Sequence, residues 1–156
     1  MKVIGCGNPD RGDDSAGIEV AKRLRQAGLA AEIHTGDALG LLEKWSACDD
    51  VILVDAVVTG ARPGTLHAWE CSHSAFALPK AVRDAAVSSH GFDLARAIEL
   101  ACTLGKLPAR LRIFGIEGRE FERGAAPSKE VSIAIDELVR RIQAEARVYG
   151  SAKPYD

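Results

Sequence analysis

The apolar run from residue 51 to residue 57 constrains the fold of this chain more than any other feature. Its sequence is Val-Ile-Leu-Val-Asp-Ala-Val, which is apolar at every position except Asp55. A strand on which every residue is apolar is typical of a parallel sheet covered on both faces, whereas a half-exposed strand alternates with polar residues. The run therefore predicts a buried central strand with helices on both sides of its sheet.

Strand-like and helix-like segments alternate along the rest of the chain. The further predicted strands are 2–6, 31–35, 65–71 and 111–116, and the predicted helices are 15–26, 38–45, 92–104 and 128–148. Residues 72–89 indicate loop with some helix. This alternation predicts an α/β fold of three layers, α/β/α, with a mostly parallel twisted sheet. We expect one domain over residues 1–150 and a frayed tail at 151–156.

Composition excludes several classes of protein. The chain has 156 residues, of which 47% are hydrophobic and 27% are charged, and its formal net charge is −2. This balance is that of a soluble globular protein, and it favours neither a nucleic-acid partner nor a membrane surface. The start of the chain lacks the apolar region of a secretory signal, so we expect a cytoplasmic protein.

The glycine-rich stretch at residues 3–17 follows the first predicted strand. Gly5 and Gly7 permit close approach of the backbone, and Asp13 and Asp14 stand where an N-cap of the following helix belongs. A dinucleotide fingerprint would need a third glycine at position 10, where the chain has Asp10. Two carboxylates at a helix N-terminus also oppose an anion and suit a cation.

Three side chains form a candidate metal site. In a parallel sheet ligands bind beyond the carboxyl ends of the strands, where the winding direction reverses. If the first and third strands are neighbours, Asp14 and Asp55 face each other across that crevice. His90, before the helix at 92–104, adds an imidazole to the two carboxylates, a set that suits a divalent transition metal. The structural alternatives are a capped or ion-paired Asp55 and a solvated or capping His90.

Other possible ligands and nucleophiles are weaker candidates. His67 and Cys71 share a strand face but lie roughly 13 Å apart, so together with His73 they suit one ion only if the strand bulges. No Cys-x-x-Cys pair occurs, and we expect free, mostly buried thiols at all four cysteines. Any of them could act as a nucleophile, and Cys6 in the glycine turn is the first candidate. His34 is interpreted as structural.

Five short motifs, taken together, resemble the hydrogenase maturation endopeptidases. The resemblance runs in order from Lys2 to about Val139, and two positions depart from the family pattern. Gly118 stands where a proline usually follows Ile-Glu, and residues 126–128 only approximate Leu-Ser-Pro. The motifs are Gly5-x-Gly7-Asn8, Gly12-Asp13-Asp14-x-x-Gly17, Val54-Asp55-Ala56, Ser89-His90 and Gly115-Ile116-Glu117.

The resemblance implies an aspartyl-type endopeptidase that removes the C-terminal extension of a nickel–iron hydrogenase large-subunit precursor after nickel insertion. It implies a five-stranded, phosphorylase/hydrolase-like sheet in which 65–71 is the antiparallel edge strand. By motif position Asp14, Asp55 and His90 bind the substrate's nickel and are the catalytic residues, and Asp13 is the cap. We expect a monomer, no organic cofactor, and nickel supplied by the substrate.

Two other classes of function fit the same residues. One is a metal-dependent hydrolase of small amides or phosphates, which would act without a protein partner. The other is a binding module, such as a nickel carrier or a nucleotide-binding regulator. In the endopeptidase itself the nickel could polarise the scissile carbonyl, activate water or only fix the substrate. The sequence leaves these roles open.

Overall fold

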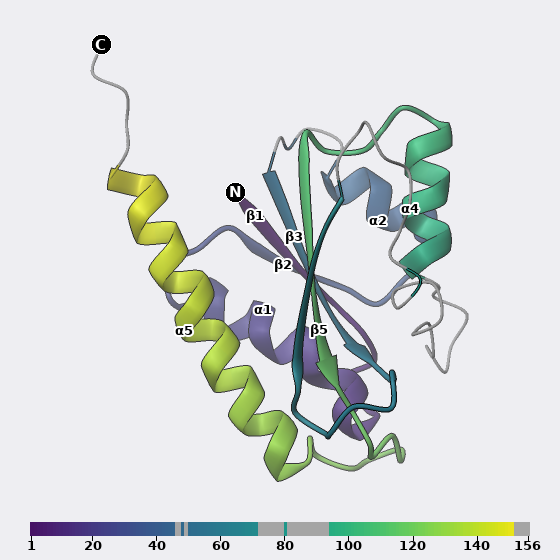
Figure 1. The fold of residues 1–156 in the computed structure, drawn as a ribbon, viewed down its shortest axis with the longest axis vertical. Coiled ribbons are helices and arrows are strands. Elements are labelled where there is room, and N and C mark those ends of the chain that lie inside the picture. The colour runs from purple at the N-terminus through teal and green to yellow at the C-terminus, as the bar shows by residue number, and fades with distance from the viewer. Residues whose placement is uncertain (46–47, 49, 72–79, 81–93, 152–156) are drawn as a thin grey trace.

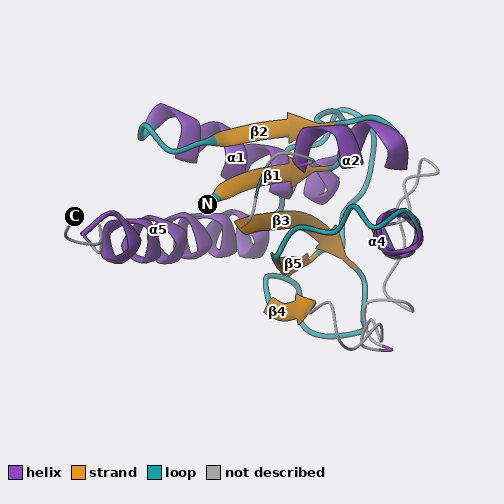
Figure 2. Cartoon of the chain, turned by 90° about the horizontal axis from the view of Figure 1, so that it is seen from above, coloured by secondary structure: helices purple, strands orange, loops and turns teal. Residues whose placement is uncertain are grey.

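A computed structural model describes residues 1–45, 48, 50–71, 80 and 94–151. A five-stranded sheet lies between two layers of helices, and Figure 1 shows how its strands fan out across the molecule. In Figure 2 the helices α5 (Lys129–Ser151) and α4 (Leu94–Thr103) lie on opposite sides of the strands. The predicted three-layer architecture is therefore confirmed. Within the described residues, no helix is long and apolar enough to cross a membrane.

The sheet has the strand order β2-β1-β3-β5-β4. Four strands are parallel, and β4 runs antiparallel to β5 at one edge, as the resemblance implied. The first and third strands in the chain are neighbours, so the winding direction reverses between them. The strands are β1 (Lys2–Cys6), β2 (Ala31–His34), β3 (Asp50–Val57), β4 (Leu66–Cys71) and β5 (Arg110–Glu117).

Each face of the sheet has its own apolar core. One core lies under α1 (Ala16–Gln26) and α5, and it takes alternate residues of β3 such as Ile52 and Val54. The other lies under α2 (Ala38–Trp45) and α4, and it takes Val51 and Leu53. Because β3 is buried on both faces, it needs apolar residues at consecutive positions, which explains the run that the sequence analysis singled out.

Two helices, α1 and α5, differ from prediction at their ends. A 3₁₀ turn, η1 (Gly12–Ser15), precedes α1, so the helix proper begins at Ala16 and Asp13 and Asp14 lie within the turn. The helix α5 continues to Ser151, whereas the sequence predicted that it ends at residue 148 and that the tail begins at residue 151. The predictions for 72–79, 81–93 and 152–156 lie outside the described residues.

The N-terminus of α1 sits directly on the ends of two strands. A Cβ atom built at Gly17 would lie 2.2 Å from the carbonyl oxygen of Val54 and 2.5 Å from that of Cys6. No side chain fits at such distances, so glycine is required for this approach of helix to sheet. The contact brings the loop that carries Asp14 over the carboxyl ends of β1 and β3.

Candidate functional site

The carboxyl ends of β1 and β3 bring two aspartates into one buried region. Asp14 lies in η1 and is 4% exposed, and Asp55 lies near the end of β3 and is 7% exposed. Asp55 follows Val51 and Leu53 at alternate positions, so its side chain projects on the α2 and α4 side of the sheet. The structure thus brings these two predicted site residues together at the expected switch point.

Burial and a neighbouring charge act on the Asp55 carboxyl. Burial, followed by the negative charge of Asp14, raises the pKa of Asp55 to about 7, although the backbone N–H of Ala56 opposes the shift. That N–H donates to Asp55 Oδ1 over 2.8 Å. No basic side chain in the described part of the chain forms an ion pair with Asp55. Burial and the like charge of Asp14 therefore favour the protonated form of the Asp55 carboxyl.

Asp13 has a different role from the one predicted, because it does not cap the helix that follows it. The backbone N–H groups of Arg119 and Glu120 donate to Asp13 Oδ2 over 2.8 Å each, and that of Ser128 donates to Oδ1 over 2.6 Å. Burial acts to raise the pKa of Asp13, but these three amides together hold it below the ordinary value. Asp13 therefore ties the loop between β5 and α5 to η1.

The other predicted ligands divide into those that the structure places and those that it does not. His90 and His73 lie outside the described residues, so the imidazole of the candidate site stays a prediction. In the described segments no group of three or more metal-binding side chains occurs. His34 is buried, and its Nε2 atom lies 2.8 Å from the Asp37 carbonyl oxygen, in agreement with a structural role.

The thiol of Cys6 is a poor nucleophile. The side chain is 0% exposed, and burial, with a further contribution from Asp55, raises its pKa well above the ordinary value. A thiol in these surroundings stays protonated at neutral pH. All four cysteines are free, as expected.

A second acidic residue ends a buried strand, and the sequence analysis names it only as part of a motif. Glu117 closes β5, is 1% exposed, and accepts hydrogen bonds at Oε1 from the backbone N–H groups of Thr59 and Gly60. The Thr59 hydroxyl donates to Oε2 over 2.8 Å, and His67 Nε2 lies 3.0 Å from the same oxygen. The rule that selected Asp55, a carboxylate at the end of an apolar strand, would also have found Glu117.

Comparison with solved structures supports the fold. The chain superposes on the hydrogenase maturating endopeptidase HybD of Escherichia coli with a TM-score of 0.75, at 23% identity, over 96% of this chain and 94% of that one. It superposes on the [NiFe] hydrogenase maturation protease HybD of Thermococcus kodakarensis with a TM-score of 0.69, at 18% identity, over 94% and 99%.

Sequence comparison places the chain in a family. The chain is 27% identical to a protein of Methanocaldococcus jannaschii over 157 residues, which cover 93% of this chain and 95% of that one. The name of that protein assigns it to the hydrogenase maturation proteases. The family model of the hydrogenase maturation proteases matches residues 18–145. That match contains Asp55 and His90, while Asp14 lies just before it. The chain belongs to the hydrogenase maturation protease family and is a peptidase.

Proposed function

We propose that this protein removes the C-terminal extension of a nickel-loaded [NiFe]-hydrogenase large-subunit precursor, and that Asp14, Asp55 and His90 bind the substrate's nickel. The observation that carries the proposal is the pair of buried carboxylates at the switch point, Asp14 and Asp55. Two like charges in one buried region destabilise each other unless a cation lies between them. A divalent cation that arrives with the substrate compensates the negative charges of both carboxylates.

The place of the pair in the fold supports a ligand site. Parallel α/β sheets bind their ligands beyond the carboxyl ends of the strands at the point where the winding reverses, and Asp14 and Asp55 occupy that point. The neighbouring Asp13 is engaged by three backbone amides, which fixes the turn that presents Asp14. His90 enters the set through its motif position.

The nickel belongs to the substrate in this proposal. Two carboxylates and one imidazole leave coordination positions open for ligands from the precursor. Asp14 and Asp55 would orient the precursor through its metal, and a precursor without nickel would offer them nothing to bind. The enzyme would therefore cut only correctly loaded subunits, and it would need no organic cofactor. We further propose that it acts as a monomer in the cytoplasm.

The test compares nickel-loaded and nickel-free precursor, each incubated with chelator-treated enzyme and analysed by mass spectrometry. Loss of the C-terminal extension is expected only with the loaded precursor. Asp14→Asn, Asp55→Asn and His90→Ala should each abolish the cleavage. Asp10→Asn, a change of an exposed aspartate on the same loop, is the matched control and should keep it.

Two results would overturn the proposal. Efficient cleavage of the nickel-free precursor would show that nickel is not the element that the enzyme recognises. Activity that depends on a stoichiometric metal purified with the enzyme would show that the metal is the enzyme's own. Thermal melts of each variant establish that lost cleavage does not reflect lost folding.

A further inference from the structure

We infer that the open edge of the sheet at β2 binds the C-terminal extension of the precursor as an added strand. The inference rests on the proposed function, and it identifies the surface that holds the part of the substrate beyond the scissile bond. It depends on the backbone groups of β2, a cleft beside them, a backbone connection to Asp14 and the distribution of charge along the edge.

The strand β2 has a neighbour on one side only. Figure 2 shows it as the outermost strand, on the side of the sheet away from β4. The carbonyl groups of Ala30 and His34 accept from β1 and from the turn after it, and in a parallel ladder the residues between such positions alternate in direction. The backbone N–H and C=O groups of Ile33 and Thr35 therefore point away from β1. The described part of the chain supplies no hydrogen-bond partner to them.

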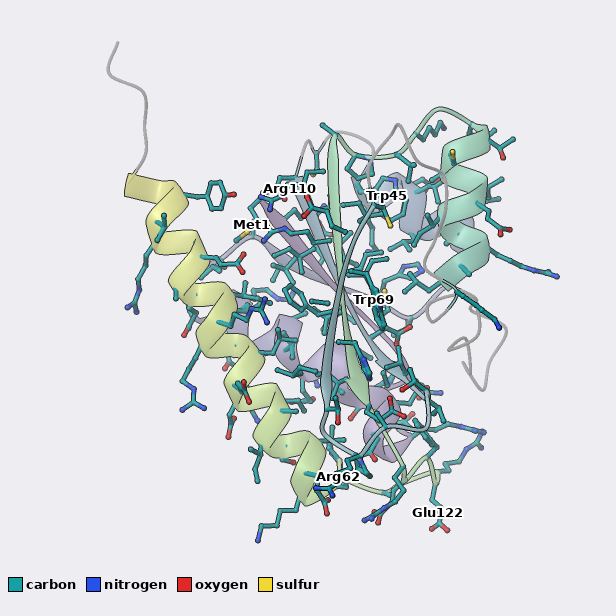
Figure 3. All side chains as sticks on the ribbon, viewed as in Figure 1. Met1, Trp45, Arg62, Trp69, Arg110 and Glu122 are labelled. Carbon is teal, nitrogen blue, oxygen red and sulfur yellow. The ribbon has the colours of Figure 1, made fainter. Side chains whose placement is uncertain are left out.

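A cleft of about 530 Å³ lies beside this edge, between β2 and α2. Its walls include residues 32–36, and Gly40 and Lys44 of α2. The helix is anchored by Trp45, which is 1% exposed and donates from Nε1 to the Lys106 carbonyl oxygen over 3.0 Å. In Figure 3 the labelled Trp45 lies among the side chains between the strands and α4. The cleft is thus formed before a ligand arrives.

Hydrogen bonds also fix the turn that joins the two walls of the cleft. His34 Nε2 lies 2.8 Å from the Asp37 carbonyl oxygen, and the N–H of Gly40 donates to Asp37 Oδ1 over 2.9 Å. A Cβ atom built at Gly36 or at Gly40 would lie 3.3 Å from His34 Cε1, so side chains there would crowd the buried ring. A preformed edge binds a peptide with little loss of conformational entropy in the protein.

Gly7 connects this edge directly to the candidate site. Its N–H donates to the His34 carbonyl oxygen over 3.3 Å. On its other side, a Cβ atom built at Gly7 would lie 2.0 Å from the Asp14 carbonyl oxygen. One residue of the backbone therefore contacts both the end of β2 and the turn that carries Asp14.

Cys6 shows the same proximity on the side of the sheet that carries α2. It pairs with His34 of β2. Burial raises its pKa most, and beyond burial the charge of Asp55 raises the pKa while that of Lys44, in the wall of the cleft, lowers it. The cleft and the Asp55 carboxyl therefore lie on either side of Cys6, on one face of the sheet.

Charge is distributed unevenly along the edge. At its start Lys2 and Lys44 both pair with Glu32, at 2.7 Å and 3.4 Å. Charged side chains of this kind protect a sheet edge against pairing with other chains. Residues 33–36 include no acidic or basic side chain except His34, and burial lowers the pKa of that ring. The half of the edge nearer Asp14 is thus the half that accepts another strand.

Distances across the sheet indicate which part of the precursor reaches this edge. Neighbouring strands are about 4.8 Å apart, so a strand added outside β2 lies roughly 14 Å from β3 and Asp55. About four extended residues span this distance. The nickel holds the part of the precursor before the scissile bond, whereas the extension is free to continue across β1. Pairing through the backbone requires no particular side chain in the extension.

Steady-state cleavage of nickel-loaded precursor tests the added strand. Thr35→Pro removes the outward N–H and places a ring where the strand would lie, and edge strands tolerate proline at such positions. KM should rise about tenfold, the effect of a lost hydrogen bond, while kcat stays within about threefold. Ala109→Pro, at an exposed position before β5, is the matched control and should leave KM unchanged. Thermal melts of both variants check folding.

A shortened precursor makes the test specific to the extension. An extension that ends about three residues after the scissile bond does not reach β2. Its KM should be about tenfold higher for the wild-type enzyme, and Thr35→Pro should then cause no further increase. A tenfold effect of Thr35→Pro on the shortened precursor would show that the substitution acts elsewhere.

Backbone methylation distinguishes strand addition from binding of side chains. A synthetic peptide with the sequence of the extension should inhibit cleavage by competing for the edge. Only alternate N–H groups of a strand face its neighbour, so N-methylation of one alternate set should abolish inhibition and methylation of the other set should not. Equal inhibition by both methylated peptides, or none by the parent peptide, contradicts strand addition.

Amide exchange gives a readout that does not require turnover or a variant. With the parent peptide bound, the amide hydrogens of Ile33 and Thr35 should exchange more slowly, because they become hydrogen-bonded. Those of Glu32 and His34, which face β1, should change little. Unchanged exchange at Ile33 and Thr35, at a peptide concentration that inhibits cleavage, would overturn the inference even if Thr35→Pro fails to fold.

The outcomes separate this inference from its alternatives and from the proposed function. If β2 pairs with a second copy of the chain, Thr35→Pro changes the sedimentation of the enzyme alone and leaves KM unchanged, which rejects the inference. If wild type cleaves the loaded precursor and Thr35→Pro keeps the same KM, the inference is wrong and the proposed function stands. If wild type does not cleave it, both are wrong.

Discussion

Asp14 and Asp55 interact electrostatically in a buried region although 41 positions separate them along the chain. Burial contributes most to the raised pKa of Asp55, and the charge of Asp14 adds to it. The relationship exists because β1 and β3 are neighbours and the turn after β1 folds over both strand ends. It makes the metal-free protein sensitive to pH in a way that can be measured.

Metal-free enzyme is expected to lose stability as the pH rises. The Asp55 carboxyl has a pKa of about 7 in the folded protein, whereas an unfolded Asp titrates near pH 3.9. Between these values the folded state binds more protons than the unfolded state, so the free energy of unfolding falls as the pH rises from about 4 to about 7 and then levels off. The upper limit of this loss is about 4 kcal/mol.

The substitution Asp55→Asn removes this dependence and should raise Tm at pH 8 in the presence of chelator. The gain should become small near pH 4, where the folded Asp55 carboxyl is protonated and the unfolded one is about half protonated. Thermal melts of both proteins across this pH range make the comparison. The same difference in Tm at pH 4 and pH 8 would show that the carboxyl is not destabilised by its surroundings.

The adjacent residues Asp13 and Asp14 should respond in opposite ways to substitution. Asp13→Ala leaves three backbone N–H groups without their acceptor and should cost about 3 kcal/mol of stability. Asp14→Ala relieves repulsion with Asp55 and should be no less stable than wild type at pH 8, while precursor cleavage is lost. Denaturant unfolding and the cleavage assay measure the two effects. Loss of stability in Asp14→Ala would assign that residue a structural role.

Alanine substitutions at Gly17 and Gly28 separate two ways in which an added side chain lowers stability. One is a clash with neighbouring atoms, and the other is the strain of a positive φ. Gly17→Ala forces a Cβ atom against the Val54 and Cys6 carbonyl oxygens and should cost about 3 kcal/mol or more. Gly28 has φ of +85° with nothing within 4 Å of an added Cβ, so Gly28→Ala should cost only about 1 kcal/mol. Urea unfolding of both variants tests this order. Similar losses would mean that α1 can move away from the strand ends.

Cys6 should be dispensable for cleavage. Its thiol is buried and its pKa is raised by burial, so Cys6→Ala should keep cleavage activity within about threefold of wild type. Native protein treated with iodoacetamide at pH 8 should be modified at Cys48 and Cys102, which are partly exposed, before Cys6. Peptide mass spectrometry follows the order of modification. Loss of cleavage in a folded Cys6→Ala variant would restore the thiol as a candidate nucleophile.

The sequence by itself determined which segments are strands and helices, the layered architecture, and the place of Asp55. These properties depend on local patterns: an unbroken apolar run needs cover on both faces, and a carboxylate near the end of such a run lies at the ligand edge of a parallel sheet. The short motifs also pointed to the family that the family model then matched over residues 18–145.

Only the tertiary structure decided which role each of two adjacent, chemically identical residues has. Asp13 and Asp14 are the same residue type at adjacent positions, and only the loop between β5 and α5 distinguishes them by donating three amides to Asp13. The contacts of Glu117 with His67 and of Trp69 with Gly115 depend on the antiparallel register of β4 on β5. A shift of one residue would turn each side chain to the other face. The partner of each β4 residue lies more than 35 positions along the chain, so the pairs themselves are visible only in the folded sheet.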